Sequence, residues 1–139
     1  MKSYYFALLT ALLWGIVPVF EKIGLARLTP AAGIFVRCLA VSAGSLILFI
    51  FKPDIITELS KTPFKYVALI IAGGFTANFM GQFLFYNALK NGDVSRVVPV
   101  AGIYPLISFL LGILILGEKL TIMKSVGIGC VMLGIFLLK

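Results

Sequence analysis

The chain has 139 residues, of which 61% are hydrophobic and 12% charged, a composition that excludes a water-soluble globular domain and indicates an integral membrane protein. The formal charge of +7 does not indicate nucleic-acid binding, because the basic residues stand mostly singly between apolar runs, as membrane-flanking charges do. Both cysteines lie in apolar segments and histidine is absent, so the sequence predicts no metal site, no cofactor and no nucleophile–base pair.

The first apolar run covers residues 3–20 and is close to the roughly 20 residues needed to cross a bilayer. It exceeds the apolar core of about 7–15 residues that is typical of a signal peptide, and no Ala-x-Ala cleavage signal follows it. We therefore expect a membrane span with a kink near its end at Pro18. Small and polar residues share its predicted inward side, namely Gly15, Pro18, Thr10, Trp14 and Glu21.

The second run covers residues 30–51, and its start has a threonine cap at Thr29 followed by proline in the first turn. Arg37 lies about two turns into this predicted helix, on the same face as Gly33 and Gly44. A charge at membrane depth costs at least a few kcal/mol, which favours a partner or a water-filled vestibule for Arg37. The alternative is that its side chain extends to the near interface.

Residues 52–65 predict an ordinary polar connection, and the third apolar run covers residues 66–89. This run predicts a helix with two distinct faces about 140° apart, a small one with Gly73 and Gly81 and a polar one with Asn78, Gln82 and Tyr86. An unpaired amide in hydrocarbon is costly, so we expect the polar face to point inward. Two interpretations stay open, interhelical hydrogen bonding and contact with a solute.

The fourth run covers residues 97–116, with Tyr104 at the edge of a face that carries Pro105 and Gly112. A proline in mid-helix leaves one backbone carbonyl without its usual donor. Such breaks often mark binding sites or hinges in transporters, although proline also occurs in membrane helices without a role. Both interpretations of Pro105 therefore stay open.

Gly117 and Glu118 predict the end of the fourth helix, and Thr121 can cap the next one. The fifth run covers residues 122–138, with Gly127 and Gly134 on one face. The sequence thus predicts five spans.

Each predicted span carries a narrow stripe of small residues, which is how helices pack where water cannot drive their association. The predicted packing glycines are Gly15, Gly44, Gly73, Gly81, Gly112, Gly127 and Gly134. The fold class is therefore an all-α integral membrane protein, with five transmembrane helices in one bundle and a single domain over residues 1–139. No paired carboxylates, phosphate-binding loop or other catalytic constellation is present, so we do not expect an enzyme.

A set of short motifs lies in a fixed order along the five predicted spans: Trp14-Gly15, Pro18-Val19-Phe20, Lys22, Arg37, Asn87-Ala88-Leu89, Pro105, Gly117-Glu118, Gly127 and Gly134. Through them the whole chain resembles a single EamA-type domain of the drug/metabolite transporter superfamily, of the half-size, five-span kind. The resemblance implies a multi-pass protein of the cytoplasmic membrane that moves a small metabolite by alternating access, usually exporting amino acids or related compounds. It also implies a bundle of two inverted five-helix halves, of which this chain would supply one.

In such folds the substrate cavity lies near the membrane midplane between the repeats. The residues we expect around it are aromatic or neutral and polar: Thr10, Trp14, Asn78, Gln82, Tyr86 and Tyr104. Their chemistry suits an amphipathic or zwitterionic solute. Structural or gating roles are expected for Pro18, Arg37, Pro105 and Glu118.

Two other functions compete with this prediction. Small multidrug-resistance exporters also use short subunits, but they place a carboxylate in the middle of the first helix, whereas Glu21 is predicted at the end of its helix. The other alternative is a membrane subunit that stabilises a partner and transports nothing.

The predicted working unit, embedded in the lipid bilayer, is a homodimer, possibly with its two chains inserted in opposite orientations. Basic residues are balanced between the two sides, with six on the N-terminal side (Lys2, Lys52, Lys61, Lys65, Lys119 and Lys124) and five on the other (Lys22, Arg27, Lys90, Arg96 and Lys139). Because an excess of lysine and arginine sets orientation, this balance predicts insertion both ways. A single orientation, with a parallel dimer or a separate partner, is the alternative.

Overall fold

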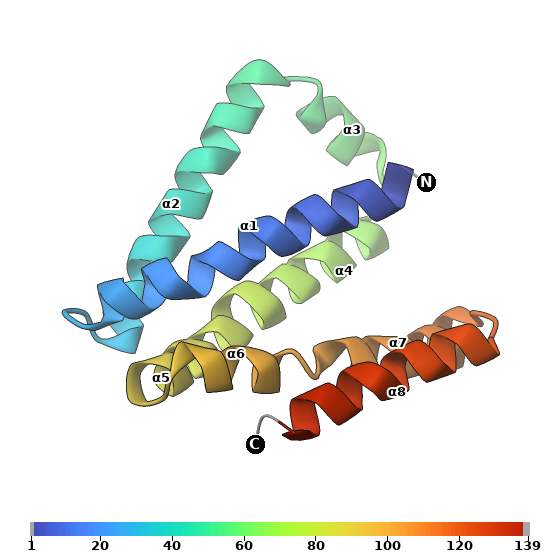
Figure 1. The fold of residues 1–139 in the computed structure, drawn as a ribbon. Helices are drawn as coiled ribbons and strands as arrows, with labels where there is room; N and C mark the ends of the chain where they lie inside the picture. The colour runs from blue at the N-terminus through green and yellow to red at the C-terminus, as the bar shows by residue number, and fades with distance from the viewer. Residues whose placement is uncertain (1, 138–139) are drawn as a thin grey trace. The chain divides into compact units, whose positions relative to one another are not determined.

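The computed structural model describes residues 2–137, which contain helices and no strand (Figure 1). Four helical segments in this range are long and apolar enough to cross a membrane: Ser3–Leu25, Pro30–Phe51, Phe64–Asn91 and Val94–Leu116. The fifth predicted span corresponds to a shorter apolar helix, Ile122–Leu137, and its expected last residue, Leu138, lies outside the described residues. The all-helical membrane fold is confirmed, while the count of five spans stays a prediction.

The chain divides into two compact units, Met1–Asn91 and Gly92–Lys139. The single domain predicted over the whole chain therefore stays a prediction. Within the first unit the helices are α1 (Lys2–Leu25), α2 (Pro30–Phe51), α3 (Ile55–Lys61), α4 (Phe64–Phe75), the π-helix η1 (Thr76–Gly81) and α5 (Gln82–Asn91). The second unit contains α6 (Val94–Ala101), α7 (Tyr104–Leu116) and α8 (Ile122–Leu137).

Helix α1 is longer than the sequence predicts, since it continues past residue 20 to Leu25 with Pro18 inside it. Glu21 and Lys22 are good helix formers, and both side chains have partners on other helices. Glu21 therefore lies a full turn inside the helix, and its expected place at the helix end is wrong.

Helix α2 begins as predicted, with the Thr29 hydroxyl accepting a hydrogen bond from the Ala32 amide at 3.2 Å and Pro30 in the first turn. The connection that follows is not an ordinary loop, because it contains α3 (Figure 1). The side chain of Glu58 stands in the first turn of α3, where a negative charge is favoured by the helix dipole.

The third predicted span is one helical stretch whose middle part, η1, is a π-helix between the α-helices α4 and α5. A π-helical turn holds more residues than an α-helical turn. Residues that would share one face of a helix with about 3.6 residues per turn therefore point in different directions before and after η1. Asn78 lies exposed on η1, whereas Gln82 and Tyr86 belong to α5. The single polar face predicted for these three residues is therefore split.

Buried side chains of the first unit gather at one end, where the end of α1, the start of α2 and the end of α5 meet. They are Pro18, Leu25, Ile34, Tyr86 and Leu89. We call this region, with the connection 26–29, the packed end. The remaining lengths of α1, α2 and α4 expose their large apolar side chains, as expected for helices that lipid or another chain covers.

Two lysines tie α1 and α5 together at the packed end. The Lys22 ammonium donates to the Leu89 carbonyl, near the end of α5, at 2.6 Å. The Lys90 ammonium donates to the carbonyl of Leu25, the last residue of α1, at 3.3 Å and to the Leu28 carbonyl in the connection at 2.6 Å. The last carbonyls of a helix have no donor within the helix and carry partial negative charge. A lysine ammonium there donates hydrogen bonds to them and is stabilised by the helix dipole. Each helix thus caps the other, which holds their C-terminal ends together.

In the second unit the predicted mid-helix position of Pro105 is wrong. The fourth predicted span breaks after Ala101, and Pro105 is the second residue of α7. Gly102 leaves the helical conformation at ψ 5° while its amide still donates to the Val98 carbonyl. The N–H groups of a first helical turn have no partner within the helix, so a proline there removes no hydrogen bond. Pro105 therefore lies at the start of a helix rather than in its middle.

The turn between α7 and α8 follows the sequence prediction. Gly117 has a left-handed conformation with φ 67° and its amide donates to the Gly112 carbonyl, a conformation that glycine adopts without strain. The Glu118 amide donates to the same carbonyl at 3.1 Å, and the Glu118 carboxylate pairs with Lys124 at 3.3 Å. The Thr121 hydroxyl caps α8 by accepting from the Lys124 amide at 3.3 Å.

Candidate functional site

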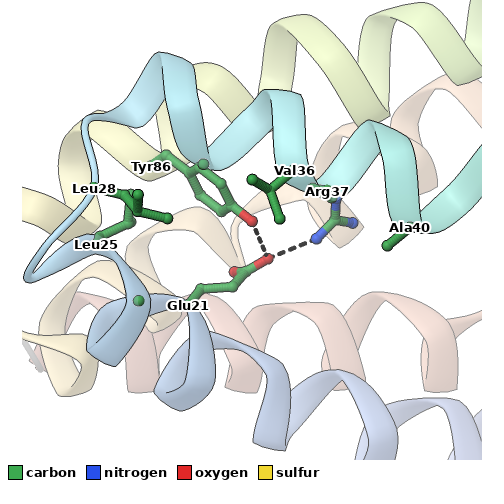
Figure 2. Close-up of a pocket in the computed structure, with 9 residues that line it drawn as sticks. Glu21, Leu25, Leu28, Val36, Arg37, Ala40 and Tyr86 are labelled. Carbon is green, nitrogen blue, oxygen red and sulfur yellow. Dashed lines mark hydrogen bonds and ion pairs between the residues drawn. The ribbon is translucent and has the colours of Figure 1, made fainter.

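A carboxylate at the packed end connects three helices (Figure 2). Oε1 of Glu21 on α1 accepts from the Arg37 guanidinium of α2 at 2.6 Å. The same oxygen accepts from the Gln82 amide and the Tyr86 hydroxyl of α5, both at 2.9 Å. We call these four residues the Glu21 cluster.

The Glu21 cluster is largely withdrawn from solvent, since the side chains of Glu21 and Arg37 are only 9% and 29% exposed. Isolated charges are costly in such a place, and the ion pair with its added hydrogen bonds offsets that cost. The compensation is incomplete, because Oε2 of Glu21 and Nε of Arg37 are buried without a hydrogen-bond partner among the described residues.

A pocket of about 190 Å³ lies against the cluster. Its walls are apolar apart from the charged pair and Tyr86, and the remaining lining residues are Gly24, Leu25, Leu28, Gly33, Val36 and Ala40 (Figure 2). Since one water occupies about 30 Å³ of liquid, the pocket has room for several waters or for one small solute.

Gly33 allows α2 to approach this region closely. A Cβ atom at this position would lie 3.0 Å from the Tyr86 ring and 3.1 Å from the Leu25 side chain, which is closer than ordinary contact. Glycine therefore lets the ring of Tyr86 rest against the backbone of α2 without displacing the side chains of Tyr86 and Leu25.

Three of the residues singled out from the sequence, Arg37, Gln82 and Tyr86, are brought together by Glu21. The partner expected for Arg37 is thus present. Among the other predicted cavity residues, Thr10 donates to the Phe6 carbonyl of its own helix at 2.9 Å, and Trp14 is 63% exposed on α1. Asn78 is also exposed, so none of these three joins the cluster.

Tyr104 belongs to the second unit, where it lines an open groove of about 570 Å³ together with Pro105, Ser108, Phe109, Lys124, Gly127, Ile128 and Val131. This groove is wide and exposed, and Lys124 is its one charged lining residue. The arrangement favours an apolar occupant in that groove.

The predicted packing glycines differ in their surroundings. A Cβ atom at Gly15, Gly44, Gly73, Gly127 or Gly134 would meet nothing within 4 Å in the described chain. At Gly112 it would lie 3.4 Å from the Glu118 side chain, and at Gly81 3.2 Å from the Thr76 carbonyl of its own helical segment. Most of these glycines therefore mark faces that are open in a single chain.

Sequence reasoning missed the central role of Glu21 because it expected this residue at the end of its helix. A signal was available, since the first three apolar runs contain no acidic residue and Glu21 directly follows the first of them. A buried arginine needs an anionic partner, so Arg37 pointed to Glu21.

Comparison with known proteins supports the membrane assignment. The model of the EamA-like transporter family matches residues 1–139. An uncharacterized protein of Methanocaldococcus jannaschii is 31% identical over 131 residues, which cover 94% of this chain and 91% of that protein. An uncharacterized transporter of Sinorhizobium is 25% identical over 96% of this chain and 94% of its own length.

Longer relatives also match. An uncharacterized transporter of Pseudomonas aeruginosa is 29% identical over 96% of this chain, but the match covers only 45% of that protein. No solved structure matches the chain. With a family model that spans all 139 residues and helices apolar enough to cross a bilayer, the chain is an integral membrane protein that belongs to the EamA-like transporter family.

Proposed function

We propose that this protein moves a small amphipathic or zwitterionic metabolite across the cytoplasmic membrane, in the export direction, by alternating access. The observation that carries the proposal is the Glu21 cluster, in which a charged pair on apolar helices borders a pocket. Charged residues inside membrane segments are costly and generally mark solute or ion pathways. A pocket with apolar walls and both signs of charge suits a solute that is apolar over part of its surface.

The working unit in this proposal is a dimer. Support comes from lengths, since the chain spans 91% and 94% of two relatives but only 45% and 43% of the transporters of Pseudomonas aeruginosa and Haemophilus influenzae. Two copies would have about the length of one such long relative. The open glycine faces at Gly15, Gly44 and Gly73 are of the kind that lets membrane helices approach closely.

Export of cationic drugs through a free carboxylate is less well supported. Glu21 does lie inside the first helix, but Arg37 already pairs with it at 2.6 Å. A cationic solute would have to displace a guanidinium, which holds carboxylates more firmly than most cations do.

Flux through reconstituted liposomes tests the proposal. We expect the purified protein to release radiolabelled amino acids or quaternary amines from loaded vesicles faster than protein-free vesicles do. Gln82→Leu should reduce this flux at least tenfold, because it removes a donor of the Glu21 cluster. The matched control Glu58→Gln changes an exposed side chain on α3 and should leave the flux unchanged.

The flux screen also tests the competing functions. Release of quaternary amines alone, driven by a proton gradient, would favour the cationic-drug exporter. Absence of flux for every solute, with protein correctly inserted, would instead support a membrane subunit without transport activity.

Orientation is decided by labelling single cysteines at the two termini, in a chain with Cys38→Ser and Cys130→Ser. Because basic residues number six on one side and five on the other, we expect comparable fractions of both termini to react from outside intact vesicles. Exclusive reaction of one terminus would rule out dual insertion and leave a parallel dimer or a separate partner.

A further inference from the structure

An amide lies exposed in the middle of a membrane span. Asn78 is close to the midpoint of the apolar helical stretch Phe64–Asn91, and its side chain is exposed on η1. Lys65 and Lys90 stand near the two ends of this stretch, and basic residues in such places mark the water interfaces. Asn78 is thirteen positions from the first lysine and twelve from the second, so it lies near the midplane of the bilayer.

The Asn78 side chain differs from the other asparagines of this helical stretch. The Asn87 amide donates to the Phe83 carbonyl at 2.8 Å, and the Asn91 amide donates to the Asn87 carbonyl at 2.9 Å. Within residues 2–137 the Asn78 side chain makes no such bond. An amide without a partner is costly in hydrocarbon. A group that forms hydrogen bonds, and not lipid, is therefore expected to cover Asn78 in the membrane.

The π-helix accounts for the outward position of Asn78. Gln82 stands four positions further along and donates to Glu21. In a regular α-helix Asn78 would share the face of Gln82, but η1 covers the chain between them and changes the number of residues per turn. Asn78 is therefore exposed, and the small residues Ala77 and Gly81 lie within one helical turn of it. Small residues allow a second membrane helix to approach.

A second copy of the chain supplies a matching group. A carboxamide carries N–H donors and an acceptor oxygen, so two Asn78 side chains related by a two-fold axis can exchange two hydrogen bonds. This match holds for both relative orientations of the two chains. An axis along the bilayer normal passes through every depth, and an axis in the bilayer plane lies at the midplane, where Asn78 is located.

We propose that Asn78 of one chain hydrogen-bonds to Asn78 of a second copy, and that this pair lies at the centre of the dimer interface. Of the two interpretations of the polar side chains on this span, this inference assigns Asn78 to interhelical hydrogen bonding. The inference rests on the proposed dimer and names a residue of its contact surface. Because the pair lies at the midplane, it forms whichever orientation the labelling of the termini reveals.

Disulfide formation between two copies tests the pairing. Two cysteines are joined only where their Cβ atoms lie about 3.5–4.5 Å apart, which requires a position close to the two-fold axis. In a chain with Cys38→Ser and Cys130→Ser, Asn78→Cys is oxidised in membranes with copper phenanthroline, and linked dimers are measured on non-reducing gels. We expect about tenfold more linked dimer than from the matched control Met80→Cys, which has nearly the same depth, another face of the helix and 54% exposure.

A second measurement does not depend on cysteines. In lipid vesicles that contain donor-labelled and acceptor-labelled chains, energy transfer reports the dissociation constant of the dimer. We expect Asn78→Leu to raise this constant about fivefold, the effect of losing one interhelical hydrogen bond in a membrane. The matched control is Ser45→Ala, because the exposed Ser45 hydroxyl donates within its own helix, to the Val41 carbonyl at 3.0 Å. This control should leave the constant unchanged.

Equal amounts of linked dimer from Asn78→Cys and Met80→Cys would overturn the proposal. Absence of linked dimer would overturn it too, and is the result expected if another part of the chain or a different protein covers Asn78. An unchanged dissociation constant for Asn78→Leu has the same meaning. Neither measurement needs a transported solute, so linked dimers without flux support this inference and count only against transport, whereas flux without linked dimers does the reverse.

Discussion

Replacing Glu21 with methionine should lower the free energy of unfolding by about 1–3 kcal/mol, the cost of leaving polar groups that are withdrawn from solvent without their partner, and less than the cost in a fully buried ion pair. The change leaves the Arg37 guanidinium, only 29% exposed, without its anion. It also removes the acceptor that Gln82 and Tyr86 share. Unfolding by sodium dodecyl sulfate in mixed micelles measures the loss.

A double-mutant cycle separates the stability lost with the Glu21–Arg37 interaction from the stability lost through the substitutions themselves. Glu21→Met combined with Arg37→Met should recover most of the stability that either change alone removes, because well-packed apolar side chains replace buried ion pairs at little cost. The comparison pair Glu118 and Lys124 is about half exposed, so Glu118→Met should cost at most about 1 kcal/mol. Equal losses at Glu21 and Glu118 would contradict a buried role for the Glu21 cluster.

Gly33→Ala should lower the free energy of unfolding by about 1–3 kcal/mol, the usual cost of an extra methyl group in a well-packed region. The new Cβ would lie 3.0 Å from the Tyr86 ring and 3.1 Å from Leu25. Both neighbours are buried and tied to the ends of α1 and α5, so neither can move away freely. The same micelle unfolding assay measures this loss.

Gly74→Ala is the matched control on α4, because a Cβ there would meet nothing within 4 Å. It should be neutral or stabilising by about 0.5–1 kcal/mol, since alanine restricts the unfolded chain more than glycine does. Equal effects of the two alanines would mean that Gly33 serves no close contact. A larger loss at Gly33 than at Gly74 supports the contact between α2 and Tyr86.

The candidate site was only partly predictable from sequence. Arg37, Gln82 and Tyr86 could be identified because a charge or an amide in an apolar run is costly unless it faces a partner. Glu21 was missed because its place depends on where α1 ends, and α1 continues to Leu25. In this last part of α1, Glu21 and Lys22 are bonded to residues far along the chain.

The split between Asn78 and Gln82 could not be predicted from periodicity. The periodicity of side chains identifies a helix face only if the number of residues per turn is constant. The π-helix over Thr76–Gly81 changes this number locally. Likewise, Pro105 could be expected to interrupt a helix, but the break at Gly102 that makes it a helix start depends on backbone conformation at neighbouring residues.

The sequence by itself determined the membrane class, the approximate extent of the helices and the family resemblance, because hydrophobicity and local turn residues act over short stretches of chain. Only the tertiary structure decided that Glu21 joins Arg37, Gln82 and Tyr86, which are 16 to 65 positions away. Such contacts depend on which helix ends meet and how closely Gly33 lets them approach. The physical reason is that one carboxylate oxygen can accept from three donors on two other helices only after packing has placed those donors around it.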